Sequence, residues 1–359
     1  MFPPFKSPFQ LEHIQQAWRQ FRLKSSRSLS LLFALGISLS LITASCSSNA
    51  PTPTASAPSA APVASSAVTS TTTVRIGFQK AASVLSLLKS KGLLEQAFAA
   101  SGASVTWSEF PAGQPLLEAL NSGSIDFGYT GEAPPIFAQA AGVPVRYVAY
   151  DPWGPKGEAI VVPQDSPIKS LAELKGKKVG VAKGSNTQYL LVSALQSVGL
   201  TFDDVEVKFL KPADARAAFE RKDIDAWSIW DPYLAVAEEQ ANARILTDAT
   251  GLAPNRGYYL ASQAFVDKSA DALKVVLDEV KKESEWATNN PTEVAKFLSS
   301  SLGIEQTVLE KAEKRREYGV LPITPEVIRN QQKIADTFQA IKLIPKPIRI
   351  QDAVSNGVS

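Results

Sequence analysis

Apolar and polar positions follow two alternating periods along most of this chain. Short segments with apolar residues spaced along them, at 74–78, 104–110 and 125–129, predict strands. Segments with apolar residues at helical spacing follow these runs, at 84–88, 115–120 and 136–140. Because strands that alternate with helices form βα units, the pattern predicts a parallel sheet covered by helices.

The same alternation restarts in the second half of the chain. Ser170 and Glu173 have the spacing of a capping box and predict a short helix. A strand at 177–182 and a helix at 187–198 follow, and 225–231 reads as another strand that leads into a helix near Pro232. Two α/β lobes are the simplest architecture that accounts for both halves.

Later helices are predicted from their starting residues and from their charge. Asn290 before Pro291 and Thr324 before Pro325 each place a capping residue ahead of a proline at the first helical position. The doublet Glu238–Glu239 and the charged run 313–317 are predicted to be solvated helix surface.

The first 73 residues have a composition of their own. A basic segment is followed by an apolar run at 29–42, by small residues and by Cys46, so we interpret 1–46 as an export signal. It resembles a bacterial lipoprotein signal, in which Cys46 would be lipidated and become the mature N-terminus. A plain secretory signal and an uncleaved anchor are the alternatives. Residues 47–73, rich in Ser, Thr, Ala and Pro, predict a disordered tether.

Composition and charge exclude several classes of function. The 359 residues are 45% hydrophobic and 20% charged, which is typical of a globular protein. Without 1–46 the chain has 32 basic and 34 acidic residues, so a concentrated basic face for nucleic acid is not expected. Cys46 is the single cysteine and His13 the single histidine. An internal disulfide is therefore excluded, and we expect no metal site and no histidine-based catalysis.

Candidate binding residues follow the predicted strands, where helix N-termini attract anions in parallel sheets. These loops supply glycines, hydroxyls and amides, and one of them supplies an aromatic residue with a carboxylate. The residues are Gln79, Ala112, Gly113, Thr130, Gly131, Glu132, Ser185, Asn186, Thr187, Trp230 and Asp231. The alternative at each loop is helix capping, notably by Ser185, by Thr187, or by Asp231 ahead of Pro232.

Several of these stretches resemble one family, the aliphatic sulfonate-binding proteins, which are periplasmic components of ABC importers. The matching stretches are RIGFQK (75–80), EFPAG (109–113), GSIDFG (123–128), PPIFAQAAG (134–142), PADARAAF (212–219) and DAWSIWDPY (225–233). They occur in the family's order between about residues 74 and 345. The scaffold is shared with relatives that bind taurine, nitrate or thiamine precursors.

The resemblance implies an α/β fold, the type II periplasmic-binding-protein clamshell, with two lobes of mixed, mostly parallel sheets. Two hinge crossings are expected, near Val162–Pro163 and near Tyr258–Tyr259. Lobe 1 would then span 74–162 plus 259–345, lobe 2 would span 163–258, and 346–359 would be a C-terminal tail.

The implied function is capture of an aliphatic sulfonate by a periplasmic, membrane-tethered monomer that delivers it to an ABC permease without a cofactor. A sulfonate is a monoanion with three oxygens, so its site should be rich in hydrogen-bond donors. Arg256 is expected to add a counter-charge, while Glu132 and Asp231 suit pairing with a ligand ammonium. Two other classes stay open, an exported lyase or hydrolase that uses Glu132 and Asp231 as acid and base, and a surface adhesin.

Overall fold

A computed structural model of the chain describes residues 72–152 and 154–355, which belong to one compact unit. The predictions of a signal at 1–46, of lipidation at Cys46 and of a tether at 47–73 fall almost entirely outside the described residues. Among the residues that are described, no helix combines the length and the apolar character needed to cross a membrane.

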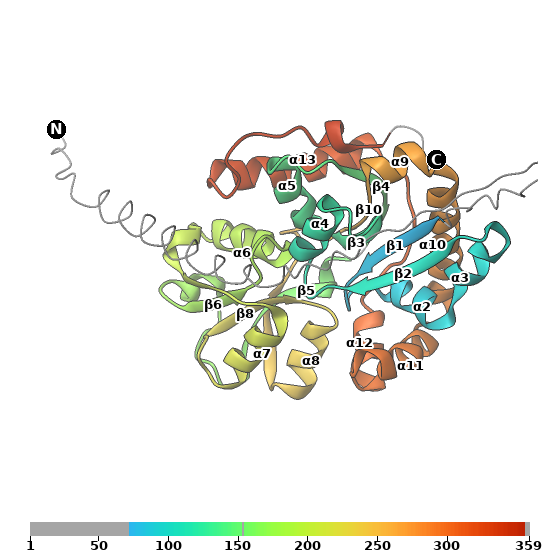
Figure 1. The fold of residues 1–359 in the computed structure, drawn as a ribbon. Coiled ribbons are helices and arrows are strands. Elements are labelled where there is room, and N and C mark those ends of the chain that lie inside the picture. The colour runs from blue at the N-terminus through green and yellow to red at the C-terminus, as the bar shows by residue number, and fades with distance from the viewer. Residues whose placement is uncertain (1–71, 153, 356–359) are drawn as a thin grey trace, which may run out of the picture. The chain divides into compact units, whose positions relative to one another are not determined.

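Two five-stranded sheets form the framework of the described chain (Figure 1). The first sheet has the order β2 (Ser104–Glu109), β1 (Thr73–Phe78), β3 (Phe127–Gly131), β10 (Gly257–Ser262) and β4 (Val145–Asp151). The second has the order β7 (Glu206–Phe209), β6 (Lys178–Val181), β8 (Ala226–Trp230), β5 (Glu158–Pro163) and β9 (Ala243–Asp248). We call the halves built on these sheets lobe 1 and lobe 2.

Both sheets have the same pattern of strand directions. In lobe 1, β1 is parallel to β2 and β3, whereas β10 is antiparallel to β3 and β4. In lobe 2, β6 is parallel to β7 and β8, whereas β5 is antiparallel to β8 and β9. The prediction of two mixed sheets is therefore confirmed, with half of the strand pairings in each sheet parallel and half antiparallel.

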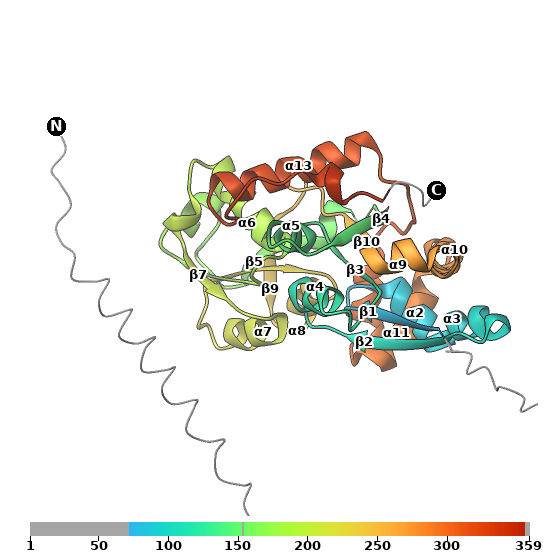
Figure 2. The ribbon, with the colours of Figure 1, turned by 45° about the horizontal axis from the view of Figure 1, so that its top comes forward.

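Helices follow the parallel strands and cover the sheets (Figure 2). In lobe 1 they are α2 (Ser83–Lys91), α3 (Leu93–Phe98), α4 (Gly113–Asn121), α5 (Ala133–Ala140), α9 (Gln263–Lys268), α10 (Ala270–Asn289), α11 (Pro291–Leu302), α12 (Gln306–Glu313) and α13 (Pro325–Ala340). In lobe 2 they are α6 (Asn186–Ser197), α7 (Pro212–Glu220) and α8 (Tyr233–Gln240). Short 3-10 turns are η1 (Ala99–Ser101), η2 (Pro155–Gly157), η3 (Leu171–Leu174), η4 (Phe202–Asp204) and η5 (Ile350–Ala353).

The chain crosses between the lobes at places other than those predicted. It leaves the first sheet after β4 and enters the second at β5, and it returns between β9 and β10. Val162–Pro163 therefore lies at the end of β5, and Tyr258–Tyr259 lies inside β10. Both strands are apolar and buried, so the sequence did not distinguish a strand next to a crossing from the crossing itself.

The end of the described chain is packed rather than a free tail, which corrects part of the prediction for 346–359. Ile350 and Ala353 are buried on η5. Val354 forms an isolated bridge with Tyr147 of β4, and the Ser355 N–H donates to the Tyr147 carbonyl at 3.0 Å. The chain up to residue 355 thus closes the edge of the first sheet.

Helix starts agree only partly with the sequence. Thr324 caps α13, because its hydroxyl accepts the Val327 N–H at 3.3 Å. Ser170 does not cap η3 with its side chain, and Glu173 accepts the N–H of Lys169 instead, at 2.6 Å. The predicted capping box is therefore absent from this turn.

The charged run 313–317 was predicted to be solvated, and that prediction is wrong for most of it. Glu313 is buried and accepts the Ser83 hydroxyl at 2.7 Å. Arg316 is also buried, and Arg315 pairs with Asp231 at 3.4 Å and with Glu238. Buried charges are tolerated when they are paired, and these partners lie on other elements. The Arg315 pairs join the segment after α12 in lobe 1 to Asp231, just before α8, and to Glu238 in the last turn of α8 in lobe 2.

Phe338 packs helix α13 into the core, and its ring centroid lies 5.0 Å from that of Phe137 and 5.8 Å from that of Tyr189 on α6. Phe338 is fully buried, so we expect Phe338→Ala to lower the free energy of unfolding by about 3–5 kcal/mol. The exposed Phe209, changed to Ala, is the matched control and should cost below about 1 kcal/mol. Urea unfolding followed by circular dichroism measures both, and equal losses would contradict the packing described.

Candidate ligand-binding site

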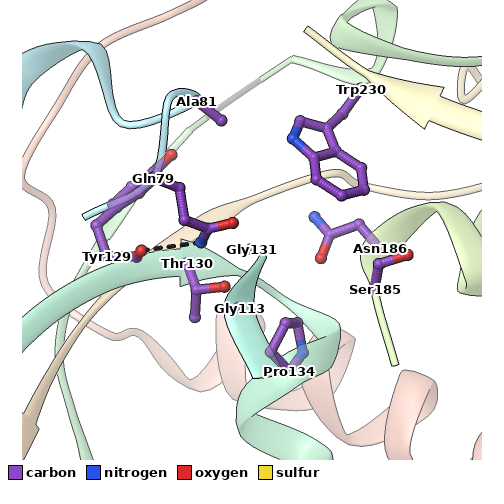
Figure 3. A pocket seen from close by; sticks show the side chains of 10 residues that line it. All are labelled: Gln79, Ala81, Gly113, Tyr129, Thr130, Gly131, Pro134, Ser185, Asn186 and Trp230. Carbon is purple, nitrogen blue, oxygen red and sulfur yellow. Dashed lines mark hydrogen bonds between the residues drawn. The ribbon is translucent and has the colours of Figure 1, made fainter. Parts of the chain in front are cut away.

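A small cavity of about 30 Å³ lies between the lobes in this arrangement. Lobe 1 lines it from the loop after β1, the end of β3 and the starts of α4 and α5, and lobe 2 lines it from the start of α6 and the end of β8. The lining residues are Gln79, Ala81, Gly113, Tyr129, Thr130, Gly131, Pro134, Ser185, Asn186 and Trp230 (Figure 3). The cavity thus brings together seven of the twelve predicted site residues.

Three helices from both lobes begin at this cavity. Gly113 starts α4, Pro134 follows the first residue of α5, and Asn186 starts α6. The first amides of a helix lack partners within the helix and carry a partial positive charge. Helix α5 contributes charge more than donors, since Pro134 and Pro135 have no N–H. Helices α4 and α6 are therefore the better source of backbone N–H groups for an anion.

The lobe 1 wall is closely packed around Thr130. Thr130 is buried at the end of β3, and a Cβ added to Gly113 would come within 2.1 Å of its hydroxyl oxygen. Glycine at this position therefore lets the start of α4 approach Thr130. Gln79 is held beside it, because its side-chain Nε2 donates to the Tyr129 carbonyl at 3.2 Å (Figure 3). The wall presents a hydroxyl and an amide in fixed positions.

Asn186 joins the two lobes across the cavity. Its Oδ1 accepts the Ala133 N–H of α5 at 3.1 Å, and its Nδ2 donates to Asn255 on the second crossing at 3.1 Å. A Cβ added to Gly131 would lie 2.3–2.5 Å from the Asn186 side chain, so only glycine allows this contact. The amide of Asn186 therefore fixes lobe 2 against lobe 1 where the cavity is formed.

No Asp, Glu, Lys or Arg is among the lining residues of this cavity. Tyr129 is the one ionisable residue in the lining, and its hydroxyl donates to Asp151 at 3.0 Å. Burial raises the pKa of Tyr129 well above its usual value, so its side chain stays neutral. The walls of the cavity therefore carry polar groups among apolar ones and no charged side chain.

Glu132 does not line the cavity. It is fully buried, and its two carboxylate oxygens accept the main-chain N–H groups of Asn255 at 3.2 Å and Arg256 at 3.0 Å. Burial raises the pKa of Glu132 to about 7, while these N–H groups and the Arg256 charge oppose the shift. In this position the Glu132 side chain connects the start of α5 to the second crossing.

Asp231 also lies outside the lining, and its geometry is that of the capping alternative. Its Oδ1 accepts the Ala235 N–H of α8 at 3.0 Å, and Arg315 lies 3.4 Å from its other oxygen. Burial raises the pKa of Asp231 to about 6, while the Arg315 charge opposes the shift. Pairing with a ligand ammonium, expected of Glu132 and Asp231, has no geometric support in either residue.

The remaining predicted residues stand behind or beside the cavity. Ala112 precedes α4 in extended conformation, and the buried Thr187 hydroxyl lies 3.0 Å from that of Ser185. Ser185 itself caps α6, accepting the Gln188 N–H at 3.3 Å, and still lines the cavity. Arg256 lines a different cavity. No charged counter-ion for a ligand is therefore found where Arg256 was expected to supply one.

Sequence reasoning missed Ala81, Tyr129 and Pro134 in the lining. Tyr129 lies inside β3, one residue before the Thr130 loop, and Pro134 lies in the PPIFAQAAG stretch just after it. Both positions adjoin predicted ones, so the nearby strand end was the available signal. Ala81 is held by Arg316, whose Nη1 donates to the Ala81 carbonyl, a contact with no local signal.

Comparison with known proteins places this architecture in a family. The family model described as "NMT1/THI5 like" matches residues 97–294. A protein from Escherichia coli (strain K12) named "Putative aliphatic sulfonates-binding protein" is 40% identical over 297 residues, which cover 82% of this chain and 92% of the relative. The chain belongs to the aliphatic sulfonate-binding protein family.

Solved structures of this family have the same fold. The alkanesulfonate-binding protein from Xanthomonas axonopodis pv. citri bound to MOPS is 38% identical, with a TM-score of 0.75 over 79% of this chain and 98% of that chain. The periplasmic aliphatic sulphonate binding protein from Escherichia coli is 40% identical, with a TM-score of 0.73 over 79% of this chain and 92% of that chain. The predicted periplasmic-binding-protein fold and the family resemblance are therefore confirmed.

Glu158 is another buried carboxyl group of this protein. It lies opposite Trp230 where β5 pairs with β8. It is fully buried, and neither carboxylate oxygen has a hydrogen-bond partner among the described residues. Burial and the nearby Glu132 raise the pKa of Glu158 well above its usual value. Burial without a hydrogen-bond partner therefore favours the protonated, neutral form of Glu158 in the folded protein.

A raised carboxyl pKa predicts that stability is lost as pH rises, because the unfolded chain releases the proton first. Glu158 should lower the free energy of unfolding by about 1.4 kcal/mol per pH unit above its unfolded pKa of 4.5. We expect Glu158→Gln to flatten the fall that begins as pH rises above the unfolded pKa of 4.5, measured by urea unfolding. The exposed Glu118→Gln is the control, and a curve for Glu158→Gln that is parallel to the wild type would contradict the burial effect.

Proposed function

We propose that this protein captures an aliphatic sulfonate between its lobes, outside the cytoplasm, and delivers it to an ABC import permease. The observation that carries the proposal is the uncharged, donor-bearing cavity between the lobes of a chain in this family. The names of the relatives supply the ligand class, and the geometry supplies the reason why a sulfonate fits.

The chemistry of the anion matches the walls. A sulfonate carries one negative charge at any physiological pH and has no proton to donate, so each of its three oxygens accepts hydrogen bonds. Hydroxyl and backbone donors such as Thr130 and the first amides of α4 and α6 can each contribute about 1.5–3 kcal/mol to binding of a charged group. Because no lining cation balances a second charge, a dianion would be disfavoured.

The rest of the ligand meets neutral surface as well. Trp230 from lobe 2 faces Pro134 and Ala81 from lobe 1 across the cavity (Figure 3). These side chains suit an alkyl group, and no lining carboxylate is available to an ammonium. We therefore propose that the site selects alkanesulfonates over aminoalkanesulfonates such as taurine.

Capture requires the lobes to separate and close around the ligand. We propose that lobe 1, with residues 73–151 and 257–355, moves against lobe 2, with residues 158–248, about the two crossings. The Asn186 amide, which bonds to Ala133 and Asn255, holds the closed arrangement. Closure would present a composite surface of both lobes to the permease, and the protein would act as a monomer.

The proposal assigns no reaction to the site. The residues considered as acid and base, Glu132 and Asp231, bond to main-chain N–H groups and do not line the cavity. A ligand incubated with the protein should be recovered unchanged, whereas turnover would favour the lyase or hydrolase alternative. We further propose that Cys46 carries a lipid anchor and that 47–73 tethers the lobes to the membrane.

Isothermal titration with ethanesulfonate and taurine tests the ligand class, because the two differ by one ammonium group. Desolvating an ammonium without a partner is costly, so we expect ethanesulfonate to bind at least about tenfold more tightly. Equal affinity for taurine would contradict the neutral cavity, and no binding of either ligand would contradict the proposed function.

A substitution at Thr130 tests whether the lobe 1 wall donates hydrogen bonds to the ligand. Thr130→Val keeps the shape of the side chain and removes one donor, so ethanesulfonate affinity should fall about tenfold. Thr106→Val, the same change at an exposed position of β2, should leave affinity within about twofold. If the two variants bind equally well in titration calorimetry, Thr130 is not a donor to the ligand.

A further inference from the structure

A second cavity, of about 310 Å³, lies beside the second crossing and apart from the cavity between the strand ends. We call it the hinge cavity. Tyr189 of α6 contributes from lobe 2, Asn330 and Lys333 of α13 contribute from lobe 1, and the crossing itself contributes Gly251, Leu252, Ala253, Pro254 and Arg256. Its walls therefore come from both lobes and from the segment that connects them.

The guanidinium of Arg256 lacks a counter-ion in this cavity. Its Nη1 is buried and has no hydrogen-bond partner among the described residues. The nearest described interaction of the side chain is with the ring of Tyr150, whose centroid lies 5.9 Å from the guanidinium carbon. Since buried donors are normally satisfied, the unpartnered Nη1 of an arginine that lines a cavity points to a missing acceptor.

The surroundings leave the cavity positively charged. Lys333 adds a second cation and forms no ion pair in the part of the chain that the structure describes. No carboxylate lines the hinge cavity. The charge of Arg256 does act on Glu132, but the Glu132 oxygens accept the main-chain N–H groups of Asn255 and Arg256. Two cations thus face the cavity without an equivalent negative charge.

We propose that the hinge cavity binds a small oxyanion, with Arg256 as its main donor. A guanidinium presents paired N–H groups that match two oxygens of a sulfate, phosphate or carboxylate, and Lys333 would add a point charge. Asn330 supplies a further amide to the same cavity. Neither the ligand cleft nor its residues take part in this site.

Occupancy of the hinge cavity is coupled to closure of the lobes. The cavity is complete only while α13, α6 and the crossing keep their present arrangement, so an anion bound there favours that arrangement. By linkage, the anion then raises affinity for a ligand that also favours it. This coupling rests on the proposed function, whereas oxyanion binding itself does not.

The test of binding is an amide NMR titration with sodium sulfate at constant ionic strength, with ethanesulfonate present to fill the cleft. We expect saturable shifts at Gly251–Arg256 and at Asn330–Lys333. Arg256→Gln should abolish them, and Arg256→Lys, which keeps the charge and loses the fork, should weaken them. Arg329→Gln, an exposed cation on α13 outside the cavity lining, should leave them unchanged.

Shifts that do not saturate, or that persist in Arg256→Gln, would overturn the proposal. The spectrum of Arg256→Gln without sulfate shows whether it folds, and Arg256→Lys decides the matter if it does not. For the coupling, sulfate should tighten ethanesulfonate binding in the wild type and leave Arg256→Gln unaffected. If sulfate shifts occur without any ethanesulfonate binding, the hinge site stands and the proposed function fails.

Discussion

The structure depends on a single geometric constraint, which is that the strand ends of two sheets face each other across one gap. In each sheet the parallel strands end at the same edge, and helices begin there. The antiparallel strands β5 and β10 lie next to the two crossings between the lobes. This allows the edge of the second sheet at which helices begin to face the same edge of the first sheet. The starts of α4, α5 and α6 consequently meet at one cavity, and oriented peptide dipoles supply the positive potential that an anion needs.

Charged side chains are abundant around this cavity but are committed elsewhere. Glu132 fastens the second crossing, Asp231 caps α8, and Arg315 pairs with Asp231 across the lobes. Each is satisfied by a fixed partner, so none is available to a ligand. Selection among anions therefore follows from neutral hydrogen-bond donors and from the absence of charged lining residues, rather than from an ion pair with the ligand.

Much of the fold could be predicted from the sequence, because strand and helix periods are local. The predicted strand ends also identified Gln79, Thr130, Ser185 and Trp230 as site residues, since ligand sites in such sheets follow parallel strands. The crossings were misplaced because β5 and β10 are buried strands whose apolar runs look alike whatever their direction.

The roles of individual side chains could be assigned only from the tertiary structure. Whether Asp231 caps a helix or meets a ligand is decided by its rotamer and by Arg315, which lies 84 residues away in sequence. The burial of Glu313 depends in the same way on Ser83, which lies 230 residues away. Capping and binding use the same residue types at the same loop positions, and only contacts distant in sequence distinguish the two.

A crystal structure of the protein with ethanesulfonate would test the central claim most directly. The account predicts the sulfonate group inside the cavity between the lobes, within hydrogen-bond distance of the Thr130 hydroxyl and of first-turn amides of α4 or α6, with the ethyl group against Trp230. Contact of the sulfonate with an arginine or lysine side chain, or a sulfonate bound outside this cavity, would contradict it.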